Sequence, residues 1–311
     1  MELHILDMSN YLYAGRSSRK FITRGVRETD GAYAANRAPI GAVKYCLDQV
    51  RMLTGKQSVV MPVFDSTPTI KREMYASAFG DPYGYKAGRA SKPSDFGIIR
   101  DYVEWILRDL GYNVQRAECY ESDDIIYTLV KMFKDDYEKV YVHTRDSDLY
   151  FLVSDNVEIA KCGVQGKDIN LRNYSEVVDK DSYCWYNTVH IRKLYGGDSS
   201  DNIPGVGWSW STYVDSVIPE EDFAKLGDLD LARKYLREAS MKFPMEPKAH
   251  LLVNIFNIVC PLDVPFDLID NSEPDIDFQK FDQYYMLEWL KENDHWDLES
   301  RLLEYIDGFY E

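Results

Sequence analysis

The sequence predicts an α/β protein with a mostly parallel sheet and helices on both faces of that sheet. Short apolar runs rich in β-branched residues alternate with amphipathic stretches in the first half of the chain, which is the pattern of consecutive β-α-β units. Acidic residues stand at the ends of several of these runs. After about residue 190 the chain is acidic and aromatic without such alternation, so a mainly helical C-terminal region is expected.

The expected strands are Glu2–Asp7, Ser58–Asp65, Tyr112–Ala117, Lys139–Asp146 and Asn156–Lys161. Helical periodicity predicts helices over Gly41–Gly55, Ser94–Gly111 and Ser122–Phe133. Ser94 can cap the second of these helices, and Gly111 stands where a helix usually ends. Because parallel strands need crossover connections, the intervening helices are expected to cover the sheet.

Residues 66–94 interrupt this alternation. The segment is basic, aromatic and rich in Gly and Pro, and it stands between a strand and a helix, where a few linking residues are usual. We therefore expect a functional insertion there. The chain divides into an α/β domain, residues 1–190, which carries this insertion, and a helical C-terminal region, residues 191–311.

Composition restricts the class of protein. The five cysteines are scattered and form no C-x-x-C pair, which argues for a reducing compartment and against a zinc ribbon. The chain opens MELHILDMSN, with acidic residues where a signal peptide would be basic. Its most apolar stretch, His250–Leu262, is too short to cross a bilayer and predicts a core helix. We expect a monomeric cytoplasmic protein (in the host cytoplasm if the chain is viral) with no membrane partner.

The net charge of −16 conceals a strong asymmetry. Residues 1–120 carry 17 Lys and Arg against 13 Asp and Glu, whereas residues 121–311 carry 19 against 39. One basic cluster, within residues 16–27, includes Arg16, Arg19 and Lys20. A second comprises Lys71, Arg72, Lys86, Arg89 and Lys92. Each cluster fits either a solvated surface or a phosphate-binding loop.

Nine acidic residues are predicted to meet at one edge of the sheet, because ligands of an open parallel sheet bind beyond the carboxyl ends of its strands. They are Asp7, Asp65, Glu121, Asp123, Asp124, Asp146, Asp148, Asp198 and Asp201. Any one of them could be a turn or cap residue, but together they would repel unless cations neutralised them. Oxygen ligands without His or Cys suit Mg²⁺ or Mn²⁺, and a pair of such ions about 4 Å apart is a standard device for phosphodiester cleavage.

Six short motifs resemble those of the 5′-nuclease family, which contains flap endonucleases and 5′→3′ exonucleases. YESDDIIYTL resembles the family's E-x-D-D block, HTRDSDLYFLV its T-x-D-x-D-L block and GGDSSDNIPGVG its G-D-x-x-D-N-x-P-G-V block. ILD and VFD resemble its two earlier aspartate motifs, and YKAGR resembles its Y-K-x-x-R element. The motifs occur in the family's order over residues 1–207. The compact chain, with no polymerase attached, is most similar to stand-alone bacteriophage members of the RNase H or 5′-exonuclease type.

The resemblance implies a PIN-like fold and a phosphodiesterase of replication or repair that uses two Mg²⁺ ions, which Mn²⁺ can replace. Carried over by motif, the tighter metal site takes Asp7, Asp65, Glu121, Asp123 and Asp146, with Asp124 as a ligand or a support of the ligands. The second site takes Asp148, Asp198 and Asp201. Lys86 and Arg89 would contact the scissile phosphate. Tyr85 would stack on a base, and residues 66–94 would form an arch through which a 5′ single strand passes.

The resemblance also implies a helix-hairpin-helix near IPGVG. Backbone N–H groups around Gly205 and Gly207 would hold a DNA phosphate, often through a monovalent cation such as K⁺. Asp198 and Asp201 would point the same way on a first helical turn. Trp208 and Trp210 stand where the family has small or basic residues, so an altered hairpin is expected.

The implied substrates are DNA with a 5′ flap, a nick or a free 5′ end, and RNA paired to DNA. A single-strand-binding protein or a clamp is a candidate partner. Two alternatives remain: a PIN-type ribonuclease acting on single-stranded RNA, and a non-catalytic, structure-selective DNA-binding protein. A nucleotide-binding enzyme is disfavoured, because neither G-x-x-x-x-G-K-[ST] nor G-x-G-x-x-G after a strand occurs.

Overall fold

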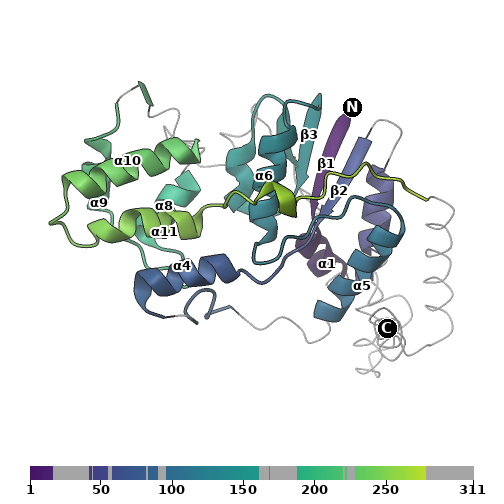
Figure 1. Ribbon diagram of the computed structural model, residues 1–311, viewed down its shortest axis with the longest axis horizontal. Helices are drawn as coiled ribbons and strands as arrows, with labels where there is room; N and C mark the ends of the chain where they lie inside the picture. Colours follow the sequence, from purple (N-terminus) through teal and green to yellow (C-terminus); the bar gives the residue numbers. More distant parts are fainter. Residues whose placement is uncertain are drawn as a thin grey trace.

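The computed structural model describes residues 1–16, 42–43, 45–54, 58–81, 83–89, 96–160, 168, 188–219, 221–222 and 228–277. The molecule is elongated, with the sheet and its helices at one end and a group of C-terminal helices at the other (Figure 1). The predicted Arg19 and Lys20 lie outside the described residues, and Arg16 ends a helix without a described side chain.

Four strands form a sheet in the order β2-β1-β3-β4, and every neighbouring pair is parallel. They are β1 (Glu2–Asp7), β2 (Ser58–Val63), β3 (Lys139–His143) and β4 (Val157–Ala160). The two central strands read as apolar runs because both of their faces are covered. The predicted parallel sheet is confirmed, with β2 and β3 ending before the acidic residues that follow them.

Side chains alternate between the two faces of the sheet and enter two separate cores. Leu3 and Ile5 of β1 belong to the core that contains α6 (Ser122–Phe133). Leu6 belongs to the core formed with α1 (Met8–Arg16) and α5 (Phe96–Asp109). Residues 42–43 and 45–53 are helical and pack in this second core. Helices on both faces are therefore confirmed, and α6 has the predicted bounds.

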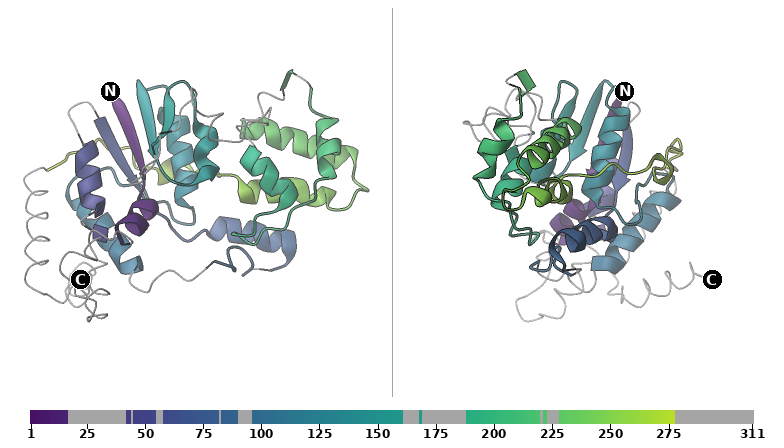
Figure 2. Two further views of the ribbon diagram at one scale, coloured as in Figure 1. Left: turned by 180° about the vertical axis from the view of Figure 1, so that it is seen from behind. Right: turned by 60° about the vertical axis from the view of Figure 1, so that its left-hand side comes forward.

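The predicted strand Tyr112–Ala117 is wrong. Only Gln115 pairs with the sheet, through an isolated parallel bridge to Val63. The side chains of Asn113 and Gln115 are buried, and their amides donate to the carbonyls of Ser272 and Asp270 at 2.6 and 2.7 Å. A chain segment distant in sequence therefore takes the place of further strand pairing. This strap, residues 261–277, runs from the C-terminal helices back across the domain (Figures 1 and 2).

The C-terminal region is mainly helical where it is described, as predicted. It contains α8 (Thr188–Gly196), α9 (Trp210–Asp215), α10 (Leu229–Lys242) and α11 (Leu252–Val259), with short 3-10 turns at Ala249–Leu251 and Phe266–Leu268. The apolar α11 contacts α8, α10 and α4 (Thr69–Phe79), so the start of the insertion packs on the C-terminal helices. No helix among the described residues is long and apolar enough to span a membrane.

Candidate metal centre

The carboxyl ends of three strands and the first turn of α6 bring the predicted acids together. Asp7 is the last residue of β1, and Asp146 caps the 3-10 helix Ser147–Leu152 that follows β3. An open pocket beside them is lined by nine of the predicted site residues. The predicted residues that line it are Tyr85, Lys86, Arg89, Glu121, Asp123, Asp146, Asp148, Asp198 and Asp201.

Asp7 is buried with an unsatisfied oxygen. Its Oδ2 accepts hydrogen bonds from Asn10 and from Thr144, the latter at 3.0 Å. Its Oδ1 is buried and has no hydrogen-bond partner among the described residues. Burial, together with the neighbouring Asp65 and Asp146, raises the pKa of Asp7 to about 7. The site therefore lacks positive charge at this point.

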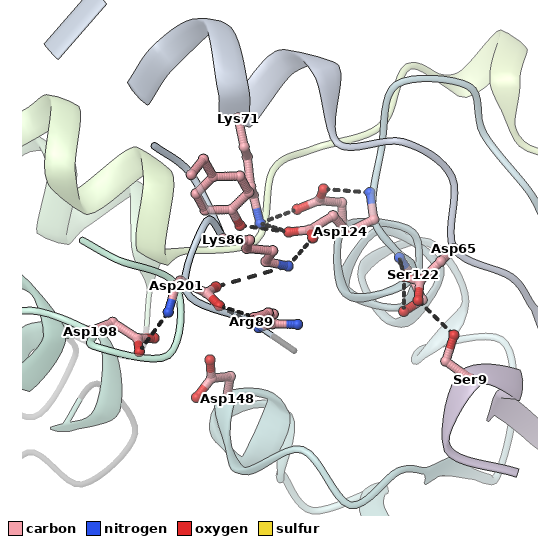
Figure 3. A network of polar contacts seen from close by, with 12 residues as sticks. Ser9, Asp65, Lys71, Lys86, Arg89, Ser122, Asp124, Asp148, Asp198 and Asp201 are labelled. Atoms are coloured by element: carbon pink, nitrogen blue, oxygen red, sulfur yellow. Dashed lines mark hydrogen bonds and ion pairs between the residues drawn. The ribbon is translucent and has the colours of Figure 1, made fainter. Parts of the chain in front are cut away.

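Asp65 is held by two serines. Ser9 donates to its Oδ2 at 2.6 Å, and the backbone N–H and hydroxyl of Ser122 donate to its Oδ1 at 3.0 and 2.8 Å (Figure 3). Asp65 follows β2, Ser9 lies in α1 and Ser122 begins α6. The carboxylate thus fixes the first turn of α6 against α1 and the end of β2.

Asp123 points into the pocket from the first turn of α6. Burial, together with Asp146, Asp7 and Glu121, raises its pKa well above the ordinary value. Asp7, Asp123 and Asp146 form no ion pair with a Lys or Arg among the described residues. We call these three residues the open acids.

Asp124 serves the fold. Its Oδ2 accepts the Glu121 N–H at 3.0 Å, closing the N-terminus of α6, and its Oδ1 accepts the Leu262 N–H at 2.8 Å. Lys71 lies 3.0 Å from the same Oδ1. Since both oxygens are used within the protein, the arrangement favours the supporting role over the ligand role for this residue.

Glu121 is surrounded by donors from the insertion. Its carboxylate accepts from Lys71 Nζ at 3.2 Å, from Tyr85 Oη at 2.9 Å and from Lys86 Nζ. Burial opposes its charge, but Lys71 and Lys86 outweigh this effect and hold its pKa at about 2. Lys71 itself is buried at the start of α4. Glu121 therefore joins the insertion to α6.

A second set of acids carries its own cations. Lys193 of α8 pairs with Asp148 and lies 2.7 Å from Asp198 Oδ2. Arg89 Nε donates to Asp201 Oδ1 at 2.8 Å, and the backbone N–H of Lys86 donates to the Asp201 carbonyl at 2.9 Å. Figure 3 shows Asp201 beside Arg89, with Asp148 and Asp198 nearby. We call Glu121, Asp148, Asp198 and Asp201 the paired acids.

The predicted helical turn for Asp198 and Asp201 is wrong. Asp198 and Ile203 form an antiparallel bridge, with both N–H···O distances 2.8 Å, around a turn. Asp198 Oδ1 accepts the Ser200 N–H at 2.9 Å and the Asp201 N–H at 3.3 Å within this turn. The turn nevertheless brings both aspartates to the pocket.

The predicted substrate-contact residues have mixed outcomes. Tyr85 is only 4% exposed, and its hydroxyl donates a hydrogen bond to Glu121. It therefore cannot stack on a base in this conformation. Gly207 donates its N–H to the Tyr195 carbonyl at 3.0 Å and cannot also offer it to a phosphate. Gly205 packs directly on the backbone of Tyr195 and Gly197. The Gly207 N–H is thus used within the protein, and Gly205 is closely packed against backbone.

The donor set fits a hard divalent cation. The Asp7 oxygen without a partner and the raised pKa values of Asp7 and Asp123 indicate uncompensated negative charge. The acidic residues offer only carboxylate oxygens as metal ligands, which suits such a cation. Among the residues that the structure describes, no group of three or more His, Cys, Asp or Glu has metal-binding geometry. Each of the paired acids forms an ion pair with a lysine or arginine side chain.

Sequence reasoning missed two residues of the site, Lys71 and Lys193. Both line the pocket, and each forms ion pairs with two carboxylates: Lys71 with Glu121 and Asp124, and Lys193 with Asp148 and Asp198. Lys71 was noted only as one member of a basic cluster, and Lys193 had no motif around it. The signal available for Lys193 was its place five residues before Asp198 on a helix that ends at the aspartate turn.

Two curated relatives are DNA polymerases. The thermostable DNA polymerase I of Thermus thermophilus is 31% identical over 227 residues, which are 70% of this chain and 25% of the polymerase. The DNA polymerase I of Chloroflexus aurantiacus is 32% identical over 145 residues, which are 46% of this chain and 15% of the polymerase. The chain thus spans a quarter or less of the length of these relatives.

Two solved structures show weaker likeness. The T5 D15 protein co-crystallized with metal ions aligns with 93% of this chain and 99% of its own, at 15% identity and a TM-score of 0.48. The catalytic core of Rad2 in complex with DNA substrate aligns with 97% of this chain and 91% of its own, at 15% identity and a TM-score of 0.48. Both TM-scores lie below 0.5, which is too low for either likeness to carry weight.

A family model decides the relationship. The model of the 5′-3′ exonuclease N-terminal resolvase-like domain matches residues 2–182, which include five of the six motifs. The match covers more than half of the chain and runs through all four strands of the parallel sheet. The chain therefore belongs to the 5′-3′ exonuclease family.

Proposed function

We propose that this protein is a metal-dependent 5′-nuclease that hydrolyses phosphodiester bonds in DNA, as a 5′→3′ exonuclease and at 5′ flaps. One observation carries the proposal: the open acids, of which Asp7 is buried, form no ion pair with a cation among the described residues. Asp123 and Asp146 also line a pocket that presents Lys86 and Arg89. Such a pocket can take a divalent ion and a phosphate together.

The open acids would hold the ion, with Asp65 beside Asp7. A bound Mg²⁺ or Mn²⁺ would supply a water of lowered pKa and stabilise charge on the phosphoryl oxygens. Thr144 and Asn10 fix the orientation of Asp7 through its Oδ2, which leaves the buried Oδ1 without a hydrogen-bond partner among the described residues. We extend the proposal to a second ion at Asp148 and Asp198.

Lys86 and Arg89 would bind the phosphate of the substrate. The Arg89 side chain is 51% exposed, so its guanidinium can reach a ligand without leaving the pocket. Charge-assisted hydrogen bonds from such groups stabilise negative charge that develops during hydrolysis. Lys86 has a backbone φ of 62°, a strained value for a residue with a side chain. Its ammonium pairs with Glu121 and lies 3.9 Å from Asp201 Oδ2.

DNA with a 5′ end, nick or flap is the proposed substrate, together with RNA paired to DNA. A single-strand-binding protein or clamp remains a candidate partner. The proposal does not include K⁺ at the hairpin, because the N–H groups of Val206 and Gly207 donate to the carbonyls of Leu194 and Tyr195.

A cleavage assay tests the function. Flap, nicked duplex, RNA–DNA hybrid and single strand, each 5′-labelled, are incubated with Mg²⁺ or EDTA. Wild type is compared with Asp146→Ala and with Asp135→Ala, which removes an exposed carboxylate remote from the pocket. We expect Mg²⁺-dependent products from the flap or the hybrid for wild type and Asp135→Ala and none for Asp146→Ala.

Other outcomes select the alternatives. Cleavage of single-stranded RNA alone would identify a PIN-type ribonuclease. Binding of branched DNA without turnover in any metal would identify a structure-selective binding protein. Full activity of Asp146→Ala would refute the assignment of the site.

A further inference from the structure

Lys193 occupies the space between two acids of the pocket. It comes from the last turn of α8, and its Nζ pairs with Asp148 and lies 2.7 Å from Asp198 Oδ2. All three side chains are largely buried, with 20%, 22% and 8% of their surfaces exposed. The lysine therefore sits where oxygens from two separate segments converge.

Lys193 and the two aspartates shift one another's pKa values. Burial opposes charge on both partners, yet Asp148 and Asp198 raise the pKa of Lys193, and Lys193 and Ser200 hold the pKa of Asp198 below its usual range. Asp148 behaves differently: burial and Asp146 raise its pKa, although Lys193 opposes them. A single ammonium thus contacts two carboxylates and provides one positive charge for two negative charges.

A divalent ion and this ammonium cannot share the same oxygens. A metal bound by Asp148 and Asp198 would need their lone pairs and would repel a positive charge within hydrogen-bond distance. The open acids contain no such competitor among the described residues. An ion can bind there without displacing a protein group.

We propose that Lys193 is a resident counter-cation that competes with a divalent metal ion for Asp148 and Asp198. This inference rests on the proposed metal-dependent function. It deepens that proposal, because it makes the second ion dependent on moving one side chain. Ion binding then falls into two classes: a stronger class at the open acids, and a weaker class whose affinity is set by Lys193.

Calorimetric titration with Mn²⁺ tests the competition directly. The variants are Lys193→Met, which removes the ammonium, and Lys193→Arg, which retains the charge. Arg192→Met is the matched control, since it removes one positive charge from the adjacent, exposed position. We expect Lys193→Met to strengthen the weaker class by about tenfold or more, as loss of a charged hydrogen-bond partner suggests. The stronger class should be unchanged, and Lys193→Arg should resemble wild type.

A second measurement uses the wild-type chain and does not depend on the folding of a variant. The ε-amines are methylated under limiting reagent with and without Mn²⁺, and each lysine is quantified by mass spectrometry. Displacement from Asp148 and Asp198 should raise modification of Lys193 several-fold, whereas the exposed Lys134 should be unaffected.

The results separate this inference from the function on which it rests. Unchanged or weaker Mn²⁺ binding by folded Lys193→Met, or no change in Lys193 methylation, would overturn the competition. Metal-dependent cleavage by wild type in the same samples would leave the nuclease proposal intact. An equal gain in affinity for Arg192→Met would attribute the effect to net charge and would also overturn it.

Discussion

Asp7→Asn should stabilise the metal-free protein and abolish its activity. The variant removes one charge from a buried side chain that is 3% exposed, and it leaves the shape nearly unchanged. Asn10 and Thr144 can still donate to the retained carbonyl oxygen. The new amide would stand at the position of the orphaned Oδ1, close to the negative charges of Asp65 and Asp146. The gain in stability thus comes from charge removal and from a new donor.

The magnitude follows from the pKa of Asp7. Its rise from 3.8 to about 7 means that folding favours the protonated form. The associated stability is fully present below the pKa of the unfolded chain and is lost as pH rises through the folded value of about 7. At about 1.36 kcal/mol for each pKa unit, the loss is at most about 4 kcal/mol. Relaxation of the protein and of water around the buried charge reduces this maximum, so about 2 kcal/mol is the expected observable effect.

Urea unfolding followed by circular dichroism, in EDTA between pH 4 and pH 8.5, measures this effect. The free energies of unfolding of wild type and Asp7→Asn should agree near pH 4 and diverge by about 2 kcal/mol above pH 7.5. Added Mg²⁺ should stabilise wild type more than the variant, which keeps only the weaker class of ion binding at Asp148 and Asp198. The exposed Asp135→Asn is the control. A variant less stable than wild type at pH 8 without metal would refute the account of uncompensated charge at Asp7.

Four further substitutions test buried and exposed contacts of the C-terminal helices and the hairpin by the same unfolding measurement. Neither ring nitrogen of the buried His190 has a hydrogen-bond partner among the described residues, and burial lowers its pKa to about 3. The free energy of unfolding of wild type should therefore fall as pH drops from about 6.5 towards 3. His190→Leu should lose part of this pH dependence and be more stable by about 1–3 kcal/mol. Trp210→Ala should lower the free energy of unfolding by about 3–5 kcal/mol, because the ring is buried and its Nε1 donates to the Pro247 carbonyl at 2.9 Å. Trp208→Ala removes an exposed ring and should lower it by less than about 1 kcal/mol. Gly205→Ala should cost about 1–3 kcal/mol, since its Cβ would lie 2.2 Å from the Tyr195 carbonyl oxygen. Equal costs for Trp208→Ala and Trp210→Ala, a Gly205→Ala variant as stable as wild type, or an unchanged acid profile for His190→Leu would each contradict the corresponding contact.

The local pattern of apolar residues was sufficient to predict the sheet and its main helix. The four strands of the sheet and α6 were predictable because burial on both faces demands continuous apolar runs, and because Ser122–Phe133 has strong helical periodicity. Tyr112–Ala117 has a similar apolar content but pairs with the sheet only at Gln115. Its buried side-chain amides donate hydrogen bonds to the backbone carbonyls of Asp270 and Ser272, more than 150 residues away in the chain. No local pattern contains that partner.

The same division holds for the two tryptophans of the hairpin. Both depart from the family's motif at neighbouring positions, and the sequence does not distinguish them. In the structure Trp210 is 2% exposed and packs beside Tyr213, whereas Trp208 is 59% exposed and lies against Tyr195. The difference arises from the docking of α9 on α10.

The sequence by itself determined where negative charge collects, because the end of a parallel strand places a side chain at a known edge of the sheet whatever surrounds it. Only the tertiary structure decided which acids are neutralised. Lys71 reaches Glu121 and Asp124 because α4 packs on α11, and Lys193 reaches Asp148 because α8 packs beside the 3-10 helix Ser147–Leu152. Ion pairs depend on distances of a few ångströms between segments far apart in the chain, and helix packing sets those distances.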